Sequence, residues 1–131
     1  GDEINLIEAG QNYGWPYITG GVDYSGAPMG VGIAMEGMIS PVHVFDETVA
    51  PSGLLFVPDD GNFPEWTGDM LIGGLMTEGI VRVRLDGGEV TDVEAMEIER
   101  RIRDVVIGPD GDIWLLTEHE DGEVLRLSVS N

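Results

Sequence analysis

Short apolar runs separated by turn residues dominate the chain from residue 53 onward. The runs are rich in Val, Ile, Leu and Met, and they cover residues 53–57, 70–75, 80–85, 93–98, 104–107, 113–117 and 124–128. Runs of this length and composition are typical of β-strands, and no stretch follows the 3.6-residue period of an amphipathic helix. Turn residues stand between the runs, as in Asp86-Gly87-Gly88 and Asp121-Gly122, where glycine supplies the positive φ of tight hairpins. The pattern predicts an all-β protein with meander connections.

The pattern also repeats along the chain. Residues 54–61, 70–72 and 81–85 match residues 105–111, 113–115 and 124–127 in order and in type. A period of roughly 40 to 50 residues with several short strands in each unit is that of a β-propeller blade. The prediction is a single partial β-propeller unit over 1–131, with a little over two four-stranded blades. It comprises a loop-rich segment with an outer strand (1–45, the strand at 41–45), a complete blade (50–98) and an incomplete last blade (101–128).

Length and composition limit the class of protein. With 131 residues, of which 42% are hydrophobic, the chain can bury one modest core, and it has no apolar run long enough to cross a membrane. It has no cysteine, which excludes disulfides and thiolate metal sites. No basic segment followed by an apolar stretch is present, so no signal peptide is expected.

The charge is strongly negative, with 25 acidic residues against six arginines, no lysine and a formal net charge of −19. Such a charge makes nucleic acid and anionic membrane surfaces unsuitable partners, and leaves cations and neutral ligands open. The acid is spread along the whole chain, which is typical of proteins adapted to high salt, where screening weakens self-repulsion. We therefore expect a halophilic protein whose stability rises with salt.

Two of the arginines, Arg101 and Arg103, alternate around Ile102. In an extended strand, residues i and i+2 point to the same face, so this spacing aims both guanidinium groups at one place. Arginine binds carboxylate or phosphate oxygens in pairs, which makes the segment a candidate anion clamp. The alternative is two solvated arginines that neutralise surrounding acid, and the spacing alone favours that alternative.

Further segments carry a family pattern, in order and with few gaps. They are Gly-Asp-Glu-Ile-Asn at 1–5, Gly-Gln-Asn-Tyr-Gly-Trp-Pro at 10–16, Asp-Tyr-Ser-Gly at 23–26, Ala-Pro-Ser-Gly-Leu at 50–54, Phe-Pro-Glu-Trp at 63–66, Arg-Ile-Arg-Asp at 101–104 and Gly-Pro-Asp-Gly at 108–111. Together they resemble the C-terminal portion of the soluble aldose sugar dehydrogenases that depend on pyrroloquinoline quinone (PQQ), the glucose/sorbosone dehydrogenase family. The resemblance implies a six-bladed propeller that holds PQQ and calcium and oxidises the anomeric carbon of aldoses, in the periplasm or outside the cell.

The resemblance also implies roles for single residues. Glu3 and Tyr13 match family positions that contribute to a calcium site, and calcium prefers hard oxygen donors such as a carboxylate and a carbonyl. The residues matched to the quinone site are Tyr24, Gly74, Leu75, Met76, Arg101 and Arg103. Met76 stands where the family commonly has a lysine. For the two arginines, the resemblance favours the anion clamp over the solvated alternative.

No catalytic residue is assigned. The resemblance places the family's catalytic base, a histidine, in an N-terminal half that this chain does not match, and His43 and His119 fall in strand and hairpin positions. We expect the isolated chain to be inactive and to bind a small sugar or carboxylate. The alternative is a stand-alone, non-catalytic binding or assembly module. Because open blades expose apolar faces and strand edges, the expected partner is a second copy in a homodimer, or a missing N-terminal half.

Overall fold

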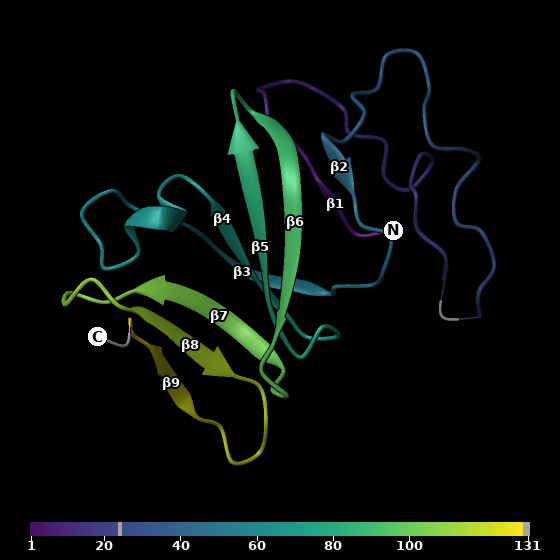
Figure 1. The fold of residues 1–131 in the computed structure, drawn as a ribbon. Coiled ribbons are helices and arrows are strands. Elements are labelled where there is room, and N and C mark those ends of the chain that lie inside the picture. Colours follow the sequence, from purple (N-terminus) through teal and green to yellow (C-terminus); the bar gives the residue numbers. More distant parts are fainter. Residues whose placement is uncertain (24, 130–131) are drawn as a thin grey trace. The chain divides into compact units, whose positions relative to one another are not determined.

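The computed structural model describes residues 1–23 and 25–129, and in this part of the chain it is all-β apart from one short 3₁₀ turn, η1 (Pro64–Trp66) (Figure 1). The strands form three antiparallel sheets of two, four and three strands. The chain divides into two compact units, residues 1–48 and residues 49–131. The all-β prediction is confirmed.

The first unit is rich in loops. Its short sheet pairs β1 (Glu3–Ile4) with β2 (His43–Val44), so that Ile4 lies opposite His43. Of the predicted strand at 41–45, the structure therefore forms only the two residues of β2. The intervening loop contains two isolated bridges, Ile18 with Gly32 and Val22 with Pro28, which return the chain on itself.

The second unit contains both larger sheets. The four-stranded sheet has the order β3 (Pro51–Phe56), β4 (Met70–Gly74), β5 (Gly79–Asp86) and β6 (Glu89–Glu97), and the three-stranded sheet has the order β7 (Ile102–Ile107), β8 (Ile113–Thr117) and β9 (Val124–Leu127). Each of the seven predicted runs overlaps one of these strands. β6 begins earlier than predicted because the two-residue turn at Gly87 and Gly88, both with positive φ, leads directly from β5 into it.

The core of the second unit lies where β3 and β4 pack against β7. Leu71 of the four-stranded sheet and Ile102 and Ile113 of the three-stranded sheet have no exposed surface. The strands approach closely at Gly73, where an added Cβ would lie 3.0 Å from Cγ2 of Ile102. The Ser52 hydroxyl lies 2.9 Å from the carbonyl oxygen of Gly73 and 2.6 Å from that of Ile102, so it can donate to either and joins the two sheets.

The sequence repeat has a counterpart in side-chain contacts. Arg82 Nε on β5 donates a 2.6 Å hydrogen bond to buried Asp69, which directly precedes β4. In the next sheet, Arg126 Nε on β9 donates a 2.6 Å hydrogen bond to buried Asp112, which directly precedes β8. Each arginine also lies over a tryptophan ring, at 5.0 Å from Trp66 and 5.5 Å from Trp114. The two sheets are therefore repeats of one unit, each with a buried aspartate held by an arginine.

Candidate functional site

The side chains of Arg101 and Arg103 converge on one carboxylate, that of Glu118. Arg103 Nη2 contacts Glu118 Oε2 directly, and Arg101 Nη2 lies 3.7 Å from Glu118 Oε1. All three side chains are partly exposed, Arg101 at 36%, Arg103 at 49% and Glu118 at 38%. The two guanidinium groups thus meet at one place, as expected, although the segment is not the regular strand on which that expectation rested.

A β-bulge and strand pairing create this convergence. Ile102 pairs with Thr117 and Asp104 pairs with Leu116, so Arg103 is the extra residue of a bulge on β7. Bulges commonly redirect a side chain next to a functional site. Glu118 follows β8 directly, and its backbone N–H donates a 2.8 Å hydrogen bond to the carbonyl of Arg101. The pairing of β7 with β8 therefore places Glu118 opposite the arginines.

The segment after β4 also reaches this site. Arg101 Nη1 donates a 3.2 Å hydrogen bond to the carbonyl of Leu75. The backbone of Leu75 and Met76 is held by hydrogen bonds to the carbonyls of Ala50 and Val49, at 3.1 and 3.0 Å. Gly74 ends β4 and is buried, whereas the Met76 side chain is 59% exposed. The structure thus brings residues 74–76 beside Arg101, so the two predicted parts of the quinone site are adjacent.

Arg101 and Arg103 differ from the remaining arginines in the number of carboxylates that they contact. Arg84 pairs with Asp92, Arg100 pairs with Glu123, and Arg82 and Arg126 each contact two carboxylates. In the described part of the chain, only Arg101 and Arg103 share a single carboxylate between them. These three side chains together carry a net charge of +1, on a protein whose net charge is −19.

Sequence reasoning missed Glu118. In the sequence it directly precedes His119 in the acidic segment Glu-His-Glu-Asp at 118–121, where a hairpin is expected. Hairpin register alone does not identify it, because the regular pairing of β7 with β8 would place Glu118 opposite Ile102, and only the bulge between Ile102 and Asp104 moves it opposite Arg101.

The residues matched to a calcium site lie in the first unit. Glu3 Oε1 accepts a 3.0 Å hydrogen bond from Asn5 Nδ2. The Tyr13 hydroxyl is already engaged, because it donates to the carbonyl of Leu6 at 2.8 Å and accepts from the N–H of Glu8 at 2.6 Å. The available donor of Tyr13 is therefore its backbone carbonyl.

Asn5 adds an oxygen that sequence reasoning did not select. Its side-chain Oδ1 is buried and has no hydrogen-bond partner among the described residues. A buried acceptor without a partner is costly, and a bound cation would remove that cost. The described residues contain no cluster of three or more Asp, Glu or His side chains that could hold a metal. A cation here would thus depend on Glu3, amide and carbonyl oxygens and water, which is a donor set that calcium accepts.

Tyr24 lies outside the described residues, but the turn around it is described. Asp23 Oδ1 accepts a 2.6 Å hydrogen bond from the N–H of Ser25 and a 3.4 Å one from the N–H of Ala27. The Ser25 hydroxyl also donates to Asp23, and this hydrogen bond is the largest cause that holds the pKa of Asp23 below its ordinary value. The Asp23 carboxylate is therefore the common acceptor for Ser25 and Ala27.

The histidines have ordinary surroundings. His43 lies on β2 and makes an edge contact with Phe45, with ring centroids 4.9 Å apart. His119 lies at the β8–β9 hairpin beside Arg100 and Glu123, along an open hollow of about 410 Å³. Neither arrangement identifies a catalytic base.

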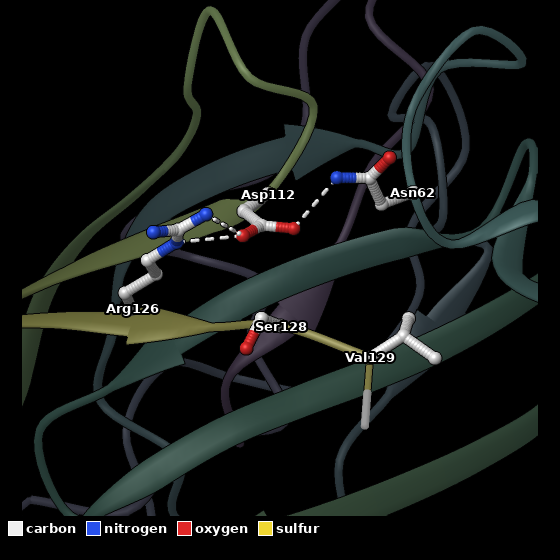
Figure 2. Close-up of a pocket in the computed structure, with 5 residues that line it drawn as sticks. All are labelled: Asn62, Asp112, Arg126, Ser128 and Val129. Atoms are coloured by element: carbon white, nitrogen blue, oxygen red, sulfur yellow. Dashed lines mark hydrogen bonds and ion pairs between the residues drawn. The ribbon is translucent and has the colours of Figure 1, made fainter. Parts of the chain in front are cut away.

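A second hollow, of about 470 Å³, lies at the junction of the two large sheets (Figure 2). Figure 2 shows Asp112 between Arg126 and Asn62, with Ser128 and Val129 completing the lining. The hydrogen bond from Asn62 and then that from Arg126 hold the pKa of Asp112 below its ordinary value, against the opposing effect of desolvation. These polar groups satisfy one another, so we assign this hollow a structural role.

Comparisons with known proteins place the chain in a family. The family model described as glucose/sorbosone dehydrogenase matches residues 1–126. The chain is 38% identical to the aldose sugar dehydrogenase YliI of Escherichia coli (strain K12), over 100% of this chain and 36% of that protein. Its fold matches a crystal structure of glucose dehydrogenase with a TM-score of 0.91 and 37% identity, over 99% of this chain and 38% of that one.

A further match is the PQQ-bound form of aldose sugar dehydrogenase from Streptomyces coelicolor. The TM-score is 0.69 and the identity 28%, over 95% of this chain and 35% of that one. The chain thus spans about a third of the length of its relatives. These matches and the two repeated sheets confirm the prediction of a partial β-propeller. The chain belongs to the glucose/sorbosone dehydrogenase family.

Proposed function

We propose that this chain is the C-terminal part of a PQQ- and calcium-dependent aldose sugar dehydrogenase and carries part of its cofactor site. The observation that carries the proposal is the convergence of Arg101 and Arg103 on one carboxylate, beside the Leu75 carbonyl. A local excess of positive charge on a strongly acidic protein is suited to an anion with several carboxylates.

PQQ, when bound, supplies the acceptor for the hydride of the sugar. The part of this chain is to bind and orient. Arg101 and Arg103 would hold carboxylates of the quinone, and the Leu75 carbonyl fixes Arg101 at the edge of the site. Arginine stays protonated at all ordinary pH values, so neither residue can accept the proton of the sugar hydroxyl. The base must therefore come from elsewhere in a complete enzyme.

Calcium belongs to the first unit in this proposal. Glu3 would provide a carboxylate and Tyr13 its backbone carbonyl, and the unpartnered Asn5 Oδ1 beside Glu3 supports a cation at this place. Because these donors fall short of the six to eight oxygens that calcium usually takes, water would complete the shell and binding would be weak.

A PQQ titration tests the cofactor assignment. With calcium present, the wild-type chain should shift the absorbance spectrum of PQQ on mixing, and Arg103→Ala should weaken the binding at least about tenfold, the lower end of the range for a hydrogen bond to a charged group. Arg84→Ala is the matched control, because Arg84 is 48% exposed and pairs with Asp92 on the β5–β6 hairpin. Equal affinity of wild type and Arg103→Ala would refute the assignment.

The alternative function is a stand-alone binding or assembly module, and one surface favours an assembly role. Val106, Leu116 and Val124 share the outer face of the β7–β9 sheet and are 48%, 45% and 66% exposed. At the equivalent positions of the preceding sheet, Leu55 and Ile80 pack in the core with residues of β7–β9, and Gly73 lies against Ile102.

The outer face is thus of the kind that receives another sheet, and for the chain alone we propose a second copy as its occupant. Sedimentation of the pure chain should show a homodimer that Val124→Asp dissociates. A monomer at micromolar concentration would contradict this assembly. In a complete enzyme, the missing N-terminal half would occupy the same face.

The compartment follows the family in this proposal, which is the periplasm or the outside of the cell. Among the described residues, no helix has the length and apolar character needed to span a membrane.

A further inference from the structure

We propose that Glu118 sets the anion affinity of the arginine site: as an internal counter-ion shared by Arg101 and Arg103, it weakens the binding of anions to the pair, and most strongly that of anions with several carboxylates. This inference rests on the proposed anion site at Arg101 and Arg103, and it concerns a residue to which neither the sequence motifs nor the proposed function gives a role.

The geometry leaves room for a ligand while Glu118 is in place. Glu118 contacts Nη2 of Arg103, but its distance of 3.7 Å from Nη2 of Arg101 is longer than a hydrogen bond. Arg101 Nη1 donates one hydrogen bond to the Leu75 carbonyl. Since each guanidinium has five donors, most remain available on both residues. Glu118 therefore holds the two groups together without saturating them.

Glu118 can act on a ligand in two opposite ways, and their magnitudes decide which is larger. By aligning the guanidinium groups it would favour binding, but an exposed ion pair changes an equilibrium constant by at most about fivefold. By repelling a ligand anion held on the same arginines it would oppose binding. For charges about 4 Å apart, this repulsion lowers the binding constant about fivefold in bulk water, and much more near a protein surface. The repulsion dominates, so Glu118 weakens anion binding.

The effect depends on the number of carboxylates in the ligand. Glu118 is held opposite Arg101 by the β7–β8 pairing and a 2.8 Å backbone hydrogen bond, so its charge stays beside the arginines when a ligand binds. The repulsion grows with the charge of the ligand, so Glu118 opposes a ligand with two or three carboxylates more strongly than a ligand with one. Such a ligand keeps a net attraction, because two guanidinium groups face one carboxylate.

The test uses three variants of the full chain and three probes, namely PQQ, citrate and acetate, at one ionic strength at which the wild type is folded. Glu118→Gln removes the charge and keeps the size, and Glu118→Asp keeps the charge. Glu120→Gln is the matched control, because it removes the same charge from the same hairpin and belongs to none of the ion pairs of the described residues. Binding is followed by the arginine Nε–H resonances and by PQQ absorbance.

Glu118→Gln should bind citrate and PQQ at least about fivefold more tightly than wild type, with a smaller gain for acetate, because the repulsion that is removed grows with the charge of the ligand. Glu118→Asp and Glu120→Gln should stay within about twofold of wild type. Equal or weaker citrate binding by Glu118→Gln, or an equal gain in Glu120→Gln, would overturn the inference.

The outcomes separate this inference from the proposed function. If PQQ affinity is the same in wild type and Arg103→Ala while citrate binds more tightly to Glu118→Gln, the cofactor assignment fails and the role of Glu118 stands. If Glu118→Gln does not fold, the wild type decides the matter. The carboxyl ¹³C resonance of Glu118 should then move on addition of citrate while that of Glu120 stays in place, and an unmoved Glu118 resonance overturns the inference.

Discussion

Asn62, on the loop after β3, donates a 2.7 Å hydrogen bond to the carboxylate of Asp112 at the start of β8, and so joins the two repeated sheets (Figure 2). The same amide donates a 2.9 Å hydrogen bond to the carbonyl of Asp110, and the Asn62 backbone N–H donates to the carbonyl of Gly111. Asp112 is only 2% exposed, so it depends on these partners for its solvation. The contact fixes one blade on the next and thereby the surface on which the arginine site lies.

Replacement of Asn62 by Ala should therefore lower the free energy of unfolding by about 1–3 kcal/mol, because it leaves a buried carboxylate oxygen without its donor. Equilibrium unfolding in urea measures the change. Asp60→Ala on the same loop, where the side chain is exposed, should have little effect. If the two variants lost the same free energy of unfolding, the Asn62 amide would have no stabilising effect of its own.

Asp112 should also make stability depend on pH at the acid end. Its pKa in the folded protein is held below the ordinary value of 3.8, chiefly by the Asn62 hydrogen bond. A carboxyl group with a lowered folded pKa contributes stability above its unfolded pKa and loses it as pH falls through the folded pKa. The contribution of Asp112 should thus be complete above about pH 4 and decline below it. Asp112→Asn should flatten this part of the curve of melting temperature against pH, and an unchanged acid limb would contradict the assignment.

The net charge of −19 predicts that salt stabilises the fold. Added salt shortens the Debye length from about 10 Å at 0.1 M to about 3 Å at 1 M, and so screens the mutual repulsion of the carboxylates. The melting temperature should rise steadily between low and molar NaCl, and a flat response would count against adaptation to high salt. Potassium chloride at the same concentrations should act alike, because screening does not depend on the identity of the monovalent cation.

Calcium should raise the melting temperature, and Glu3→Gln should remove most of that rise. The variant keeps the size of the side chain and its acceptance from Asn5, but it loses the charged oxygen that calcium prefers. Glu8→Gln is the control, because the contact of Glu8 with Tyr13 uses its backbone N–H and not its carboxylate. A calcium shift that is the same in Glu3→Gln and wild type would mean that calcium binds diffusely to the acidic surface.

The isolated chain should show no turnover of glucose in a dye-linked assay, even with calcium and PQQ supplied, because no base has been assigned in it. The PQQ absorbance shift, measured in the same sample, shows whether the cofactor site is filled. Turnover above the level of free PQQ that is abolished by Arg103→Ala would mean that this chain contains a base outside the proposed residues.

The sequence alone predicted the strands and the repeat. These features depend on local rules, since strand periodicity and turn chemistry act over a few residues. The convergence of Arg101 and Arg103 was also expected, but Arg101 precedes β7 and Arg103 is the extra residue of a bulge, so strand pairing and not regular alternation produces it. The largest shift of a strand end is at β6, which begins at Glu89 instead of residue 93 because the turn at Gly87 and Gly88 leads directly into it.

The tertiary structure decided what surrounds those residues. Leu75 is 26 residues away from Arg101, Glu118 is 15 residues away from Arg103, and Asn62 is 50 residues away from Asp112. Each contact depends on the register of one strand against another or on the packing of one sheet on the next, which local propensity does not specify. The sequence therefore identified the cations of the site, whereas the shared carboxylate and the excess positive charge followed only from how the strands pair and pack.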